Sequence, residues 1–282
     1  MSYRTILVHL DSSARGNDRV AFAVRWAKAH QAHLVGLVSS GLYDGLVIPA
    51  EAFSSGPSDF MARSAQFLAE RTERISRSFR EQVGEQVQHE VRVVDMVVID
   101  ALVRHGRCSD LVIVGQHDPS DPESLPVLGA LPQRVLMETG CPVLMHPYAG
   151  RFDRMPRRVV VAWDGSREAS MAVRAALPAL ARAAHVTVVS YGKPGAAQED
   201  ESADLQVPLL LQHLSRHGVA ASAERDTVDF EIGDALLSRL ADLDTDLLVM
   251  GGYGHSRFRE LMLGGATRRV LESMTVPVFM AH

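Results

Sequence analysis

The chain has 282 residues, enough for two domains that each bury a core, and 46% of its residues are hydrophobic and 22% charged. A net charge of −5 with no basic stripe argues against nucleic acid as a partner. No apolar run reaches the length of a membrane span, so no membrane partner is expected either.

The predicted compartment is the cytoplasm. Two cysteines, Cys108 and Cys141, are too few for a disulfide framework in a chain of this length and fit a reducing environment. The apolar run at the N-terminus is short and is interrupted by His9 and Asp11, which is not the pattern of a signal peptide.

Strands are predicted where short apolar runs occur without interruption, which is typical of a parallel sheet covered on both faces. The first half of the chain predicts strands at 6–10, 33–38, 91–94, 111–114 and 143–145. The second half predicts them at 159–163, 186–191, 227–230, 247–250 and 278–280. Helices are expected between them, for example where Met61, Leu68, Ile75 and Phe79 recur at helical spacing.

The two halves repeat each other. "TILVHLDSS" at residues 5–13 resembles "VVVAWDGSR" at 159–167, and "DLVIVG" at 110–115 resembles "DLLVMG" at 246–251. "GCPVLMH" at 140–146 resembles "TVPVFMA" at 275–281. The first half has extra residues, for which the Gly-, Ser- and Pro-rich stretch 41–60 is the natural place. We therefore predict an α/β chain of two doubly wound domains, residues 1–147 and 156–282, each with a five-stranded parallel sheet and helices on both faces.

Two local predictions concern helix ends and sheet edges. Asp204 is expected to cap a helix that ends before Gly218. Pro142 and Pro277 precede the last strand of each half, which should lie at a sheet edge. Because bare edges tend to be paired, we expect an intramolecular pseudo-dimer of the two halves through these edges and, beyond it, a homodimer.

A candidate ligand site lies at two turns of the second half. If the strand order is 3-2-1-4-5, the turn at Asp164 and the glycines Gly251 and Gly254 follow neighbouring strands at the reversal of the sheet, where ligands bind. Gly264 and Gly265 then open a last helix at 266–273, whose free N–H groups suit an anion. From spacing alone, a plain glycine turn before a glycine-initiated helix explains the pattern equally well.

The order of these motifs resembles the universal stress protein family. Gly251, Gly254 and Gly264 are similar to its nucleotide motif G-x2-G-x9-G-(S/T), "VVVAWDGS" to its first strand and aspartate turn, and "TVPVFMA" to its last strand. The resemblance covers nearly the whole chain as a tandem pair. It implies the order 3-2-1-4-5 and an adenine nucleotide, ATP or AMP with or without Mg²⁺, in the cleft.

The resemblance also implies residue roles. Asp164 corresponds to the aspartate that contacts the ribose or a bound metal, the backbone around Tyr191 to the part that reads adenine, and Thr267 to a phosphate contact. The nucleotide-binding residues implied in this way are Ala162, Asp164, Tyr191, Gly251, Gly254, Gly264, Gly265, Ala266 and Thr267. Gly265 stands where the family has Ser or Thr, so one phosphate hydrogen bond of about 1 kcal/mol is missing and weaker binding is expected.

The first half departs further from the motif. Gly115 remains, but Asp118 replaces the second glycine and Gly129 comes one residue late. Nearby acidic residues would repel phosphate and nearby prolines remove N–H donors, so we predict that this half binds no triphosphate. The acidic residues are Asp118, Asp121 and Glu123, and the prolines are Pro119, Pro122 and Pro126. Asp11 is retained, with a role as a turn residue as the alternative.

Other groups of residues give weaker indications of a metal site or a catalytic site. His213 and His217 could share a helix face, but no third metal ligand is near them in the sequence. Ser166 has no nucleophile elbow, no Walker motif occurs, and Trp26 and Trp163 are expected to pack in the interior. No catalytic residues or metal site are therefore predicted, and any ATP hydrolysis would be slow and incidental.

We therefore expect a nucleotide-binding sensor or interaction module with an unidentified protein partner. Two alternatives stay open. One is a structural or interaction protein of the same fold that binds no nucleotide. The other is a first half that binds a metal or a lipid-type small ligand beneath the insertion at 41–60.

Overall fold

The computed structural model describes residues 2–41, 57–121, 129–192, 201–253 and 265–282. The chain forms two compact units, residues 2–141 and residues 142–282. The domain boundaries expected after residue 147 and before residue 156 stay a prediction.

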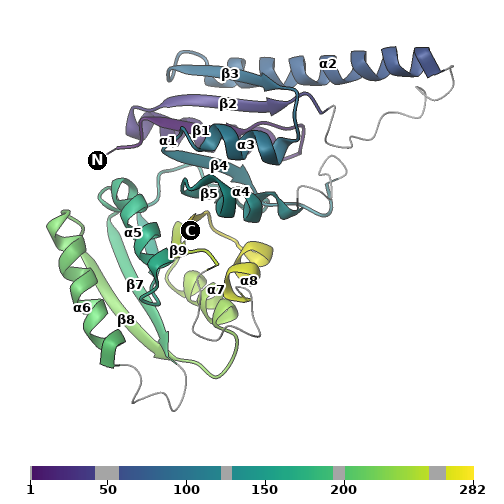
Figure 1. The fold of residues 1–282 in the computed structure, drawn as a ribbon. Helices are drawn as coiled ribbons and strands as arrows, with labels where there is room; N and C mark the ends of the chain where they lie inside the picture. The colour runs from purple at the N-terminus through teal and green to yellow at the C-terminus, as the bar shows by residue number, and fades with distance from the viewer. Residues whose placement is uncertain (1, 42–56, 122–128, 193–200, 254–264) are drawn as a thin grey trace. The chain divides into compact units, whose positions relative to one another are not determined.

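The described residues of the unit 2–141 form four parallel strands in the order β3-β2-β1-β4 (Figure 1). They are β1 (Thr5–His9), β2 (His33–Ser39), β3 (His89–Val94) and β4 (Leu111–Gly115). Helices α1 (Gly16–His30) and α2 (Pro57–Val83) pack against each other, as do α3 (Val98–Gly106) and α4 (Leu131–Thr139). Strands β1, β2 and β4 are buried almost throughout, as expected for a sheet covered by helices.

The described residues of the unit 142–282 form six strands in the order β5-β10-β9-β6-β7-β8. They are β5 (Val143–His146), β6 (Arg158–Ala162), β7 (His185–Gly192), β8 (Ala221–Thr227), β9 (Leu247–Gly251) and β10 (Val278–Ala281). The helices are α5 (Arg167–Leu180), α6 (Glu201–Arg216), α7 (Ile232–Asp242) and α8 (Gly265–Ser273). The second half thus has the order 3-2-1-4-5, and the chain has the α/β fold predicted from its repeat.

The last strand of the second half does not lie at an edge. Strand β10 pairs in parallel with β9 on one side and antiparallel with β5 on the other, with Phe279 opposite Leu144. The two final strands therefore pair with each other, as expected for bare edges. A pseudo-dimer of the complete halves stays a prediction.

Two further local predictions were wrong. The strand expected at 227–230 is β8 at Ala221–Thr227, an edge strand with mostly exposed, polar residues, and Phe230 beyond it is 58% exposed. A search for apolar runs misses such a strand because no face of it is fully buried. Asp204 lies inside α6 and does not cap it, since this helix begins at Glu201, whereas Gly218 does follow the end of α6 with a left-handed φ of 74°.

Equivalent aspartates hold the first strand of each half. Asp110 accepts hydrogen bonds from the backbone N–H of Arg4 and Thr5 at 2.7 and 2.9 Å. Asp246 accepts them from Arg157 and Arg158 at 2.9 and 2.8 Å. The repeated "DL" that precedes β4 and β9 thus has a structural role, because it satisfies two N–H groups at the entry to β1 and to β6.

Candidate functional site

The turn after β6 and the end of β9 lie at the same edge of the sheet of residues 142–282. Strands β6 and β9 are parallel neighbours, with Ala162 opposite Met250. Asp164 follows β6 by two residues and Gly251 ends β9, so both come to the carboxyl ends of adjacent strands. The strand order reverses at this point, which is where ligands bind in doubly wound sheets.

Asp164 lies in a tight turn with its carboxylate exposed. Its Oδ1 accepts the N–H of Ser166 at 2.9 Å, and Gly165 between them has a φ of 74°. The Oγ of Ser166 then accepts the N–H of Ala169 at 3.1 Å and caps α5. The turn therefore fixes the start of the helix through Ser166 and leaves Asp164 facing solvent.

Gly251 is in close contact with the first turn of α5. A Cβ at this position would lie 2.5 Å from the backbone N of Ala169 and 2.7 Å from the carbonyl carbon of Glu168. Glycine at the end of β9 thus allows α5 to begin next to the strand, which brings the helix N-terminus to the switch point.

The start of α8 contacts the chain just beyond β9. The backbone N–H of Tyr253, a residue with a left-handed φ of 52°, donates to Thr267 Oγ1 at 3.3 Å. Thr267 is buried, whereas Gly265 and Ala266 are half-buried. Since the Thr267 oxygen accepts this bond, its hydroxyl proton is left to donate to another group. Gly254 and Gly264 lie outside the described residues.

Tyr191 lies at the same edge on β7, but its side chain turns towards α7. Its hydroxyl donates to the carbonyl of Ala235 at 3.3 Å, and burial raises its pKa. A role in reading adenine would therefore fall to the backbone of Tyr191. The structure thus brings Ala162, Asp164, Gly251 and Thr267 together at one edge and directs the side chain of Tyr191 elsewhere.

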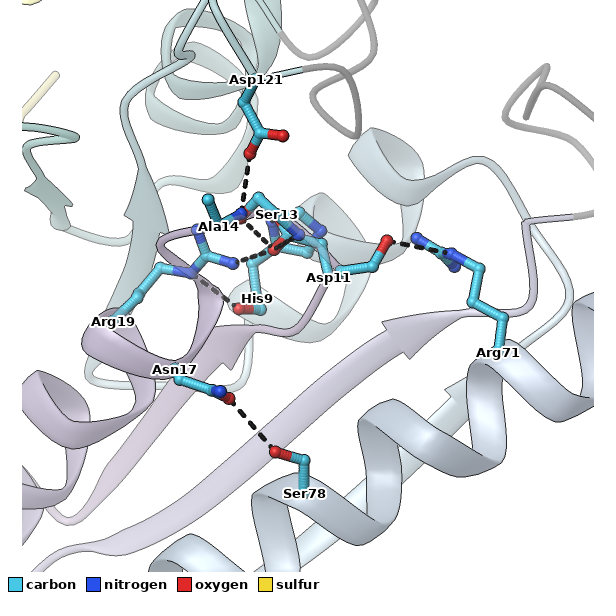
Figure 2. A network of polar contacts seen from close by, with 10 residues as sticks. His9, Asp11, Ser13, Ala14, Asn17, Arg19, Arg71, Ser78 and Asp121 are labelled. Carbon is cyan, nitrogen blue, oxygen red and sulfur yellow. Dashed lines mark hydrogen bonds and ion pairs between the residues drawn. The ribbon is translucent and has the colours of Figure 1, made fainter.

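The first half is different at the equivalent turn, because Asp11 is enclosed in a polar network (Figure 2). Arg19 Nη2 lies 2.7 Å from Asp11 Oδ1, and His9 Nδ1 lies 3.6 Å from Oδ2. The guanidinium also donates through Nε to the carbonyl of His9 at 2.9 Å. Ser13 donates to Asp11 from both its N–H and its hydroxyl.

This network keeps Asp11 ionised. Burial alone would raise the pKa of Asp11, but the charges of Arg19 and His9 and the hydrogen bonds from Ser13 and Arg19 hold that pKa far below its usual range. Asp121, beyond β4, accepts the N–H of Ala14 at 2.7 Å and so connects the segment after β4 to the same turn.

Arg19 also closes the space beside Gly115, the glycine that corresponds to Gly251. A Cβ on Gly115 would lie 2.3 Å from Arg19 Nη1. The arginine side chain thus fills the region between the ends of β1 and β4. Sequence reasoning missed Arg19, although a signal was present, since this arginine lies in the same helical phase as the buried Phe22, Ala23 and Trp26.

The described residues hold no group of three or more His, Cys, Asp or Glu side chains placed to bind a metal ion. His213 and His217 do lie side by side, with ring centroids 4.7 Å apart. Among the helices in the described part of the chain, none combines the length and the apolar character needed to cross a membrane.

Comparison with known families matches both halves. The model of the universal stress protein family matches residues 2–147 and again residues 155–282, so the chain belongs to this family. A curated relative, the universal stress protein Slr1230 of Synechocystis, is 27% identical over 170 residues. That match covers 60% of this chain and 56% of the relative.

Solved structures share the fold over nearly the full length. A universal stress protein from Archaeoglobus fulgidus matches with a TM-score of 0.70 at 16% identity, covering 98% of this chain and 95% of that one. A protein of unknown function from Pseudomonas aeruginosa, PA1789, matches with a TM-score of 0.59 at 16% identity, covering 98% and 92%. The tandem arrangement of two such folds in one chain is therefore shared with other proteins.

Proposed function

We propose that the second half binds an adenine nucleotide, ATP or AMP, and that the protein acts as a sensor or interaction module in a stress response. The observation that carries the proposal is the difference between two equivalent aspartates. Asp164 is exposed beside Gly251, whereas the side chain of Asp11 is only 12% exposed and is ion-paired with the buried Arg19. One turn is open to a ligand, and the other is closed by the protein itself.

The polar groups at the turn of Asp164 and at the start of α8 suit a nucleotide. The Asp164 carboxylate could accept from a ribose hydroxyl or hold Mg²⁺. The N-terminus of α8, with the backbone of Gly265 and Ala266 and the hydroxyl of Thr267, would face the phosphates with N–H and O–H donors. These groups would orient the nucleotide and balance the negative charge of its phosphates. Gly265 lacks the hydroxyl that the family motif supplies at its position.

Equilibrium titration tests the proposal. ATP and AMP, with and without Mg²⁺, would be titrated calorimetrically into the native protein and into Asp164→Ala and Gly254→Asp variants. We expect saturable binding by the native protein and at least tenfold weaker binding by both variants. The matched control is Asp118→Ala in the closed half, which should bind like the native protein.

Two results would count against the proposal. Absence of saturable binding by the native protein would favour the alternative of an interaction protein that binds no nucleotide. Equal binding by the native protein and both variants would remove the assigned site. Native mass spectrometry of freshly purified protein would identify a ligand that co-purifies and would also report a homodimer.

A cytoplasmic location is part of the same proposal. Cys108 is exposed and Cys141 buried, and neither forms a disulfide, as expected in a reducing compartment. Burial raises the pKa of Cys141 to about 12, which keeps this thiol protonated and unreactive.

A further inference from the structure

A hollow of the unit 142–282 lies between α5 and α6, with a volume of about 210 Å³. Its lining is contributed by the residue after β6 and by one face of each helix: Trp163, Ser170, Val173, Arg174, Gln206, Leu209, Leu210 and His213. None of the residues expected to bind the nucleotide is among them. The volume is below the usual range for drug-sized ligands, so the hollow suits a small metabolite.

The walls of this pocket combine apolar and polar side chains, and its formal charge is positive. Val173, Leu210 and the 63% exposed Leu209 supply the apolar surface beside the indole of Trp163. Arg174 brings a cation, and none of the described residues that line the pocket carries a carboxylate. In the described part of the chain, no ion pair engages the guanidinium of Arg174.

The positive potential is also felt by the histidine in the pocket wall. Burial and then the charges of His217, Arg174 and Arg216 lower the pKa of His213, and among the described residues no acidic group acts on it in the opposite direction. A bound anion would supply the missing negative charge.

Two nitrogen atoms of the pocket residues have no hydrogen-bond partner. The indole Nε1 of Trp163 and Nε2 of His213 are both buried and unsatisfied among the described residues. Buried polar atoms of this kind are uncommon in native proteins, and each calls for an explanation. Because both nitrogens are closed to solvent, a ligand acceptor would reach the indole N–H only after the neighbouring side chains move.

The equivalent hollow of the first half provides a contrast. It lies between α1 and α2, with a volume of about 160 Å³, and Leu10 takes the position of Trp163. Its lining includes the acidic residue Asp11 as well as Arg74, and Ala21 stands where the second half has Arg174. The duplication therefore produced two hollows at the same place in the fold, and only the one at Trp163 combines a cation with an acid-free lining among the described residues.

We propose that the pocket at Trp163 binds a small monocarboxylate carried on an apolar body. The guanidinium of Arg174 at the rim would pair with the carboxylate, and the indole with Val173, Leu209 and Leu210 would cover the apolar part. This inference stands on a different part of the second half from the nucleotide proposal and does not depend on it.

Benzoate is the probe, and benzamide is its neutral counterpart of the same shape. Both would be titrated into the full chain with a Trp26→Phe substitution, in which Trp163 is the one tryptophan left to report by fluorescence and by its indole N–H resonance. We expect benzoate to shift both signals saturably, at least tenfold more tightly than benzamide. Equal affinity for the two probes, or no binding of benzoate, would overturn the proposal.

Variants localise the effect. In the Trp26→Phe background, Arg174→Gln should weaken benzoate binding to the level of benzamide, and Leu209→Glu should abolish it by placing a carboxylate at the rim. Arg167→Gln, an exposed arginine of the same helix outside the pocket, is the matched control and should leave binding unchanged. Unchanged binding in the Arg174→Gln and Leu209→Glu variants would exclude this pocket.

Saturating ATP separates the two sites. If the pocket is distinct from the nucleotide cleft, the benzoate response persists in the presence of ATP and in the Asp164→Ala variant. Displacement of benzoate by ATP would show that the pocket is part of the nucleotide cleft and would overturn its assignment as a separate site.

Discussion

The guanidinium of Arg19 and the carboxylate of Asp11 form an ion pair of 2.7 Å whose side chains are 4% and 12% exposed. This pair has no counterpart in the second half, where Ala172 occupies the position of Arg19 in the repeat. A buried pair of this kind contributes to stability only as long as both charges are present, because either charge alone is costly to bury.

Removal of one partner should therefore be severe. We expect Arg19→Met to lower the free energy of unfolding of the unit 2–141 by about 3–5 kcal/mol, since Asp11 would stay buried without its cation. This free energy is measured by urea denaturation in a Trp163→Phe background, with the fluorescence of Trp26 as the signal. The double variant Asp11→Asn/Arg19→Met should recover much of the loss, and a loss below about 1 kcal/mol in the single variant would contradict a stabilising pair.

The same pair predicts a pH dependence. The pKa of Asp11 is lower in the folded protein than in the unfolded chain, so its contribution is present above the unfolded pKa of about 3.9 and is lost as the pH falls towards the folded pKa. The native protein should be more stable than Asp11→Asn at pH 7, and the gap should shrink below about pH 4. Urea midpoints measured between pH 3 and 7 test this, and a gap that stays constant with pH would speak against an ionised Asp11.

Asp246 should be needed at the entry to β6. In Asp246→Ala the N–H groups of Arg157 and Arg158 lose a charged acceptor, and we expect a loss of about 2–3 kcal/mol in the free energy of unfolding. Asp246→Asn keeps one acceptor oxygen and should lose less. Asp242→Ala nearby, at a carboxylate that is 68% exposed at the end of α7, is the control, and a similar loss there would argue against a specific role for Asp246.

Gly251 should not accept a side chain. The Cβ of Gly251→Ala would meet the backbone of α5, which cannot rotate away as a side chain can, so we expect a loss of about 1–3 kcal/mol in stability and weaker nucleotide binding. Gly129→Ala is the control, because its Cβ would have 3.6 Å to its nearest neighbour, His117. Thermal unfolding of the two variants measures the loss. Equal melting temperatures for Gly251→Ala and Gly129→Ala would refute the prediction.

The sequence predicted most of the fold because the central strands are unbroken apolar runs and recur in both halves. Nine of the ten predicted strands overlap their observed positions closely, whereas β8 was misplaced because its alternating polar residues lie at an exposed edge. The start of α6 was misjudged at Asp204, since an aspartate in the first turn of a helix looks like a cap in the sequence.

The candidate site was only partly accessible to sequence reasoning. Asp164, Gly251 and Thr267 could be placed at one edge because strand order and motif spacing determine where those residues fall. The closure of the first half could not be derived from its acidic residues alone, because it depends on the Arg19 side chain reaching from α1 to Asp11. The sequence analysis missed the pocket at Trp163 because an isolated tryptophan beside a predicted strand is usually interpreted as a packing residue.

The antiparallel pairing of β5 with β10 has a consequence for how the chain can be divided. Strand β5, which ends the first repeat in the sequence, belongs to the compact unit of the second half. The boundary between the two repeats therefore differs from the boundary between the two compact units. A fragment beginning after residue 147 would leave β10 with one bare side and would invite association with other copies. In the intact chain that contact is intramolecular, and its strength is independent of protein concentration.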